Sequence, residues 1–227
     1  MGINGYVVKS TFVSALGGLL FGFDTAVIAG TTHQLAEVYN LTPYLLGLTV
    51  SSALWGTVAG AMTAGYPGQR FGRRDSLRIM AVFYLVSALG CALAWSWGSL
   101  LAFRILGGVG IGGSSVLAPM YIAELSPPQW RGRLVGCFQI SIVVGILVAY
   151  LSNFLIGRMN FGLAEWRWQL GIAAVPAFFF LLMLFFIPRS PRWLALKNRK
   201  QEALEVLRLT GNGIQMLSHA SHSSRIS

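Results

Sequence analysis

Charged residues are scarce in this sequence. Asp, Glu, Lys and Arg together supply 11% of the 227 residues, whereas hydrophobic residues supply 55%. Soluble domains average about 25% charged residues, so this composition excludes an ordinary soluble domain. It predicts a membrane protein that crosses the bilayer several times.

Cysteine and histidine are also few. Cys91 and Cys137 lie in different apolar runs without a Cys-x-x-Cys pattern, and the three histidines lie outside these runs. We therefore expect no metal site and no cofactor, and we expect no enzyme, because an intramembrane enzyme needs clustered His, Asp, Ser or Cys in its spans. The formal charge of +10 comes largely from arginines at the ends of apolar runs, which membrane topology explains better than nucleic-acid binding does.

Six apolar runs of about twenty residues are long enough to cross a hydrocarbon core of about 30 Å. The expected fold class is an all-α membrane protein with six transmembrane helices. We place them near residues 8–30, 44–66, 77–97, 99–122, 134–156 and 168–188.

One basic stretch sets the expected orientation. GYPGQRFGRRDSLR, from Gly65 to Arg78, holds four arginines between the second and third runs. Each arginine costs roughly 2.5 to 3.5 kcal/mol at the bilayer centre, so we expect this stretch to be a cytoplasmic loop. Both termini are then cytoplasmic, and every Lys and Arg lies in the inner segments except Arg104, Arg158 and Arg167.

A short glycine-rich pattern occurs twice. LGGLLFG at Leu16–Gly22 in the first run recurs as LGGVGIG at Leu106–Gly112 in the fourth run. Because the first and fourth spans of a 3+3 repeat occupy equivalent positions, the recurrence predicts such a repeat.

The chain divides into three expected parts. Residues 1–190 form the six-helix bundle, and residues 191–210 hold a short amphipathic helix, Asn198–Leu209, on the cytoplasmic membrane surface. Residues 211–227 are polar, rich in Ser and His and without a period, which predicts a disordered tail.

Two ionisable residues fall well inside the spans, Asp24 in the first and Arg104 in the fourth. At about 1.5 Å per residue they lie at similar depth in the outer half of the membrane, and either one alone would cost a few kcal/mol, so we expect them to pair. One interpretation is a structural salt bridge. The functional one is a proton switch: burial favours the neutral carboxyl of Asp24, the guanidinium favours the charged form, and moving Arg104 away would make Asp24 take up a proton.

Polar and aromatic residues suggest further sites. Gln139 is the lone long amide in the fifth run, and its two donors and one acceptor suit vicinal hydroxyl groups, with an interhelical hydrogen bond as the alternative. Phe21 and the tryptophans fit lipid-facing or interfacial positions better than a ligand platform, and we expect Trp166 in an interfacial belt. Opposite charges at the cytoplasmic ends of the spans would form ion pairs that close this face, although membrane anchoring alone also explains the arginines.

Five segments together resemble the N-terminal half of a sugar porter of the major facilitator superfamily, over about residues 8–210. They are GGLLFGFDTAVIAG (Gly17–Gly30), GYPGQRFGRR (Gly65–Arg74), RILGGVGIGGSSVLAPMYIAELSPPQWRGRL (Arg104–Leu134), the segment around Gln139, and PRSPRWL (Pro188–Leu194). Each motif alone is weak, but the set in this order is specific.

The resemblance implies a role for each candidate residue. Asp24 falls on a position that is acidic in proton-coupled members, and Arg104 falls on its usual partner. Gln139 falls on a sugar-contacting glutamine and Phe21 on an aromatic residue near the sugar. The residues that fall on the inner salt-bridge network, which acts as a cytoplasmic gate, are Arg74, Glu124 and Arg131.

This sequence departs from the family pattern in three ways. Gln69 stands where the loop motif usually has an acid, and Arg189 stands where the Pro-Glu-Ser-Pro-Arg motif has Glu. Each change removes a carboxylate, which predicts a weakened or rewired inner gate. The family also has twelve spans, of which this sequence contains six, and much of the sugar site belongs to the other half.

The resemblance implies transmembrane transport of a monosaccharide by proton-coupled symport and alternating access, as half of a twelve-span porter. Residues 1–190 would be its N-terminal transporter bundle, in the plasma membrane. The expected partners are sugar, protons, the lipid bilayer and a second transporter half or homodimer mate, but not nucleic acid. Two alternatives stay open, a truncated or vestigial porter fragment with no transport activity of its own, and a porter for another small polar solute.

Overall fold

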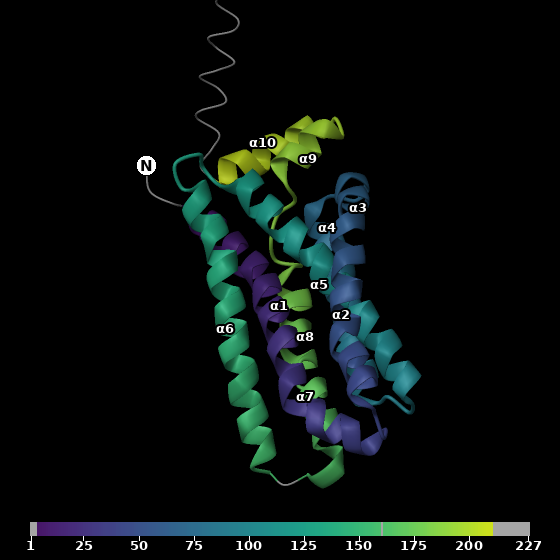
Figure 1. The fold of residues 1–227 in the computed structure, drawn as a ribbon. Helices are drawn as coiled ribbons and strands as arrows, with labels where there is room; N and C mark the ends of the chain where they lie inside the picture. The colour runs from purple at the N-terminus through teal and green to yellow at the C-terminus, as the bar shows by residue number, and fades with distance from the viewer. Residues whose placement is uncertain (1–3, 160, 211–227) are drawn as a thin grey trace, which may run out of the picture.

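Six long crossings lie side by side and alternate in direction in the computed structural model, which describes residues 4–159 and 161–210 (Figure 1). The elements are α1 (Gly5–Val38), α2 (Pro43–Thr63), its short continuation α3 (Gly65–Arg70), α4 (Arg73–Ala92), α5 (Trp97–Leu125), α6 (Arg131–Gly157), the 3-10 turn η1 (Gly162–Ala164), and α7 (Glu165–Gly171) with α8 (Ala174–Met183). The six crossings are long and apolar enough to span a membrane, and the described residues contain no strand. The predicted all-α, six-span fold class is confirmed.

Capping residues set several helix ends. The side chain of Asn4 accepts a hydrogen bond from the Tyr6 amide at the start of α1, and Thr42 caps α2 directly before Pro43. α1 therefore extends beyond the predicted 8–30 at both ends. At about 1.5 Å per residue its 34 residues exceed a core of about 30 Å, so its ends protrude from the hydrocarbon.

The third crossing ends five residues before its predicted limit of 97, because Ser96 and Ser99 form a capping box that starts α5. Trp97 consequently belongs to α5, where its indole N–H donates to the Thr49 hydroxyl at 2.9 Å. The belt prediction for Trp166 was wrong, since this side chain is 1% exposed and packs inside the bundle.

The stretch predicted as a cytoplasmic loop, Gly65–Arg78, is mostly helical. Only Phe71 and Gly72 separate α3 from α4, and Gly72 has a φ of 91°, which favours glycine. The indole of Trp193 lies over this turn, and its N–H donates to the carbonyl oxygen of Gln69 at 2.9 Å.

The packing follows the predicted 3+3 repeat. Glycines spaced by four residues on α1 and α5 lie so close to the backbone of a neighbouring helix that an added Cβ would overlap its carbonyl oxygens. The contacting pairs are Gly18–Phe138 and Gly22–Ile142 between α1 and α6, and Gly108–Ala53 and Gly112–Thr57 between α5 and α2. Because α1 and α5 run in opposite directions, the two halves of the repeat are inverted (Figure 1).

The segment after the sixth crossing forms two helices rather than one. They are α9 (Pro191–Leu196) and α10 (Lys200–Leu209), separated by a turn in which Asn198 has a φ of 59°. Both lie at the end of the bundle where α1 begins (Figure 1), and the side chain of Asn4 donates to the Leu209 carbonyl at 2.6 Å. The predicted tail, 211–227, lies outside the described residues.

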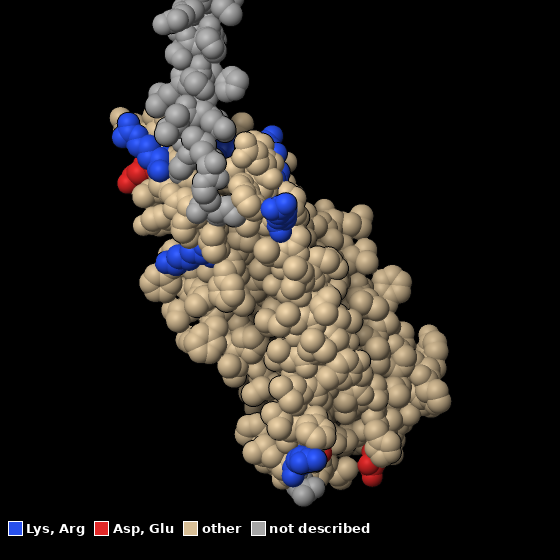
Figure 2. Space-filling view, turned by 90° about the vertical axis from the view of Figure 1, so that its left-hand side faces the viewer, with Lys and Arg blue, Asp and Glu red and all other residues tan. Residues whose placement is uncertain are grey.

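We call this end, formed by α3, α9, α10 and the first turns of α4 and α6, the arginine-rich end. Figure 2 shows one face of the molecule, with basic and acidic side chains near its two ends and a broad uncharged middle. This distribution is that of a protein whose middle lies in hydrocarbon.

Candidate functional site

Asp24 and Arg104 form an ion pair between α1 and α5, inside the bundle. The Nη2 atom of Arg104 lies 3.8 Å from Oδ2 of Asp24, and the side chains are 3% and 19% exposed, respectively. The predicted proximity of these two residues is therefore found, although 3.8 Å is longer than a hydrogen bond.

A cavity of about 80 Å³ adjoins the pair between α1, α2 and α5. Phe21 lines it together with Asp24 and Arg104, so the structure brings three of the predicted site residues together. The hydroxyl groups of Thr25 and Thr57, which also line it, donate to carbonyl oxygens of their own helices at 2.8 Å. Small-molecule sites usually measure about 300–1,000 Å³, so this cavity by itself is too small to be one.

Gln139 is exposed on α6 and does not line the cavity beside Asp24. It follows Phe138, whose carbonyl oxygen lies against Gly18 of α1. Among the described residues its amide makes no hydrogen bond to another helix, so the interhelical bond considered from the sequence is not found within this bundle. The amide is free to contact a group outside this chain.

Glu124, at the arginine-rich end, contacts Arg73, whereas Arg74, which the resemblance puts in the same network, contacts Asp75. The Oε1 atom of Glu124 lies 3.1 Å from both Nε and Nη2 of Arg73, and its Oε2 atom accepts a hydrogen bond from the hydroxyl of Ser190. These contacts tie together the start of α4, the end of α5 and the segment before α9.

Asp75 is the centre of a second cluster at this end. Its carboxylate lies 3.1 Å from Arg74, 2.8 Å from Arg78 and 3.0 Å from Arg189. Arg74 also donates to the Ile187 carbonyl at 3.1 Å. Arg189, which stands where the family motif has Glu, is therefore the third cation that contacts Asp75.

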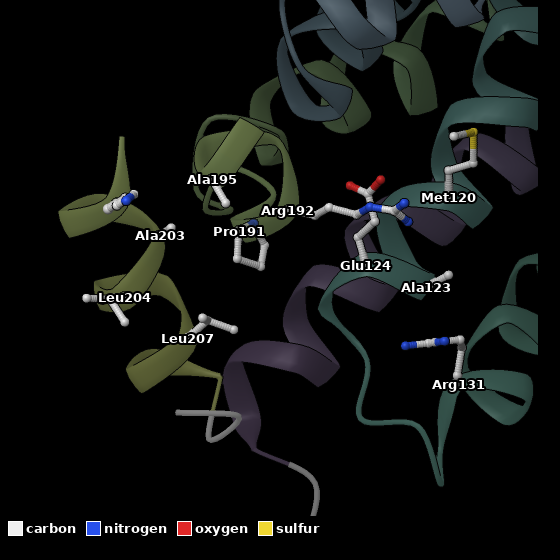
Figure 3. Close-up of a pocket in the computed structure, with 11 residues that line it drawn as sticks. Met120, Ala123, Glu124, Arg131, Pro191, Arg192, Ala195, Ala203, Leu204 and Leu207 are labelled. Carbon is white, nitrogen blue, oxygen red and sulfur yellow. The ribbon is translucent and has the colours of Figure 1, made fainter. Parts of the chain in front are cut away.

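A pocket of about 700 Å³ separates the end of α5 from α9 and α10 (Figure 3). Arg131, on the first turn of α6, lines the pocket on the same side as Glu124 (Figure 3), but within the described part of the chain Arg131 forms no ion pair. Met120 and Leu207 are among its apolar lining residues, and Arg192 is a second cation.

The sequence reasoning missed Ser190 and Tyr84 as site residues, and the family resemblance singled out Arg74 rather than Arg73 for the inner network. Arg73 and Arg74 are consecutive, and only the rotation of α4 decides which one faces Glu124. Tyr84 lies beside the Asp24–Arg104 pair. Its signal was the spacing of Tyr84, Ser87 and Cys91, which puts three polar side chains on one face of a membrane helix.

Comparison with known proteins places these features in context. The family model described as "Sugar (and other) transporter" matches residues 10–220. A D-xylose-proton symporter of Escherichia coli is 38% identical over 253 residues, covering 97% of this chain and 52% of the symporter. An arabinose-proton symporter of Bacillus subtilis is 39% identical over 215 residues, covering 92% of this chain and 46% of that protein.

A solved structure shares the fold. The partially occluded, inward-open xylose transporter XylE of Escherichia coli superposes with a TM-score of 0.90 at 37% identity, covering 97% of this chain and 60% of the transporter. The chain thus spans about half the length of the curated relatives that it matches. These relatives are transporters rather than enzymes.

Proposed function

Because this chain belongs to the sugar (and other) transporter family and is a multi-pass membrane protein, we propose that it is one half of a proton-coupled monosaccharide porter. A second transporter half or a second copy of the chain completes the substrate site. The assembly lies in the plasma membrane, with the arginine-rich end and both termini in the cytoplasm, as the position of the basic residues favours.

The observation that carries this proposal is the Asp24–Arg104 pair beside a cavity. Arg104 is 3% exposed, so its charge needs Asp24 as a counter-ion, and Asp24 needs Arg104 to stay ionised away from water. When a change in the angle between α1 and α5 separates the two, Asp24 takes up a proton. When they approach again, Asp24 releases it, which couples proton movement to alternating access.

Substrate binding uses the surface that this chain leaves open. The cavity beside Asp24 is smaller than a monosaccharide site, and the amide of Gln139 is exposed on α6. We assign Phe21 as an apolar contact of the sugar ring and Gln139 as a hydrogen-bond partner of its hydroxyl groups. The second half supplies the remaining contacts.

The arginine-rich end acts as the cytoplasmic gate. Glu124 and Asp75 hold the ends of α4, α5 and the sixth crossing together through Arg73, Arg74 and Arg189. Arg131 lines the adjacent pocket without an ion pair among the described residues, so its guanidinium remains available to an acidic group of the second half.

The test is xylose uptake into proteoliposomes that hold the chain alone, or the chain co-expressed with the C-terminal half of the Escherichia coli D-xylose-proton symporter. An imposed pH gradient should drive uphill uptake in at least one preparation. Asp24→Asn should abolish uphill uptake and preserve sugar exchange, while the control Glu37→Gln, at an exposed position of α1, should change neither. Uphill uptake that survives Asp24→Asn contradicts the coupling role. The transport proposal is contradicted if no preparation takes up or exchanges xylose or any other monosaccharide.

Gln139→Ala tests substrate binding in the same preparations. Loss of a hydrogen bond to a sugar hydroxyl should weaken the apparent sugar affinity about tenfold, because about 1.4 kcal/mol corresponds to a factor of ten. Ile140→Ala, at the next position, which is also exposed, is the matched control. If the two variants have the same affinity, Gln139 does not contact the sugar.

A further inference from the structure

A second, smaller cavity lies on the other side of the Asp24–Arg104 pair. It measures about 10 Å³ and lies between α1, α4, α5, the end of α7 and the residues that join α7 to α8. Asp24, Arg104 and Tyr84 line it, with Ala173 closing one wall. A volume of about 10–15 Å³ is the space that one water molecule needs.

Two deeply buried polar atoms belong to side chains that line this cavity. Tyr84 is 2% exposed and Arg104 is 3% exposed, yet Oη of Tyr84 and Nε of Arg104 make no hydrogen bond to any described residue. Buried polar atoms in folded proteins nearly always have a partner, and the Nε–H of an arginine is part of a charged group, which makes its isolation costly.

The charge pair itself also leaves a gap. The 3.8 Å between Arg104 and Asp24 exceeds the distance of a direct hydrogen bond, and a polar contact of that length suggests a bridging water. Ser87 also lines the cavity, but its hydroxyl already donates to the Phe103 carbonyl at 2.6 Å, so it does not donate a hydrogen bond to the Asp24 carboxylate.

We propose that one water molecule occupies this cavity and that Tyr84 is the positioning residue that holds it against the charge pair. The water accepts a hydrogen bond from Nε–H of Arg104, donates one to the carboxylate of Asp24 and exchanges a third with the hydroxyl of Tyr84. Three partners lie within the usual two to four of a buried water.

The inference deepens the proposed proton coupling, because this water is the molecule that would pass a proton to Asp24 as Arg104 moves away. Its functional consequence rests on that proposal. The water site does not, since it can be tested in the 227-residue chain in lipid nanodiscs without any transport.

The first test is water-edited solid-state NMR of the chain labelled with ¹⁵N-arginine. Magnetisation from water should reach Nε of Arg104, whose signal is assigned by its loss in Arg104→Gln. Nε of Arg78, which donates to the Leu184 carbonyl at 3.3 Å, is the internal reference. Tyr84→Phe should reduce the transfer to Arg104 at least twofold, whereas Tyr150→Phe, at an exposed position of α6, should not.

The second test is the sign of a change in thermal unfolding. If the cavity is dry, the Tyr84 hydroxyl is an unpaired buried group, and Tyr84→Phe should raise the midpoint temperature. If the water is present, the same substitution removes one of its three partners and should lower the midpoint. Ala173→Val, which keeps the hydroxyl but fills the cavity, should also abolish the water transfer to Arg104.

Each outcome decides the proposal. Water transfer that falls in Tyr84→Phe together with a lower midpoint supports it. Absence of transfer in the unmodified chain, or a higher midpoint in Tyr84→Phe, overturns the water site, and transfer that is unchanged in Tyr84→Phe overturns the role of Tyr84. Failure of the Asp24→Asn transport test alone would remove the coupling role and leave the water site standing.

Discussion

A double-mutant cycle on Asp24 and Arg104 tests the central pair quantitatively. At 3.8 Å and an effective dielectric constant of about 20, the attraction between two unit charges is about 4 kcal/mol. Because the pair is mostly buried, little of this should be lost to screening by salt. We expect a coupling energy of about 2–4 kcal/mol.

The two single substitutions should differ in cost. Asp24→Asn leaves a guanidinium that cannot lose its proton at 3% exposure, and leaving one buried charge uncompensated typically costs about 3–5 kcal/mol. Arg104→Gln leaves a carboxyl group that can bind a proton and become neutral, so it should cost less. The double substitution should be more stable than Asp24→Asn alone.

The assay is unfolding of the four proteins in one lipid or detergent system, followed by circular dichroism at two salt concentrations. A cycle whose two substitutions are additive within about 0.5 kcal/mol would refute the reasoning, because residues that do not interact behave in this way. A coupling energy that disappears in high salt would also refute it, since a buried pair should be screened weakly.

Three further predictions concern stability at other sites. Gly112→Ala should lower the free energy of unfolding by about 1–3 kcal/mol, because its Cβ would overlap the backbone of α2. Gly47→Ala, with nothing within 4 Å of the added Cβ, should raise it by up to about 1 kcal/mol. Equal effects of the two substitutions in thermal unfolding would contradict the packing. Gly72→Ala should cost about 1–3 kcal/mol, because Gly72 has a φ of 91° and a ψ of 159°, a region open essentially to glycine alone. The substitution should also speed proteolysis at the α3–α4 turn, and unchanged cleavage would count against this strain. Arg189→Gln should cost less than about 1 kcal/mol, because Arg189 is 32% exposed and Asp75 keeps other cations, and a larger or salt-independent loss in urea unfolding would show a different role.

The fold class could be predicted from hydrophobic length, because few structures other than membrane helices use six apolar runs of this size. The recurring glycine pattern likewise predicted the repeat, since Gly18 and Gly108 occupy equivalent contacts. Helix ends were less predictable. Ser96 and Ser99 form a capping box that starts α5 within an apolar region. Hydropathy averaged over a window of about twenty residues does not detect two serines of this kind.

The site was predictable where few residues competed. Asp24 and Arg104 are the ionisable residues well inside the spans, so each had one candidate partner. At the arginine-rich end several cations compete, and successive residues of a helix point about 100° apart, so the choice between Arg73 and Arg74 depends on the rotation of α4. Sequence alone does not contain that rotation.

The close glycine contacts group four helices of the bundle into two pairs, α1 with α6 and α2 with α5. At Gly22 and Gly112 the backbones of two helices are in direct contact, so no side chain between them can change rotamer to accommodate a displacement. We therefore expect α1 with α6, and α2 with α5, each to move as a rigid pair. At the contact between α1 and α5, Asp24 and Arg104 meet through their side chains, so we expect the two helix pairs to move relative to each other there. The Asp24–Arg104 ion pair joins these two rigid pairs, so forming or breaking this one contact changes how four helices are arranged relative to one another.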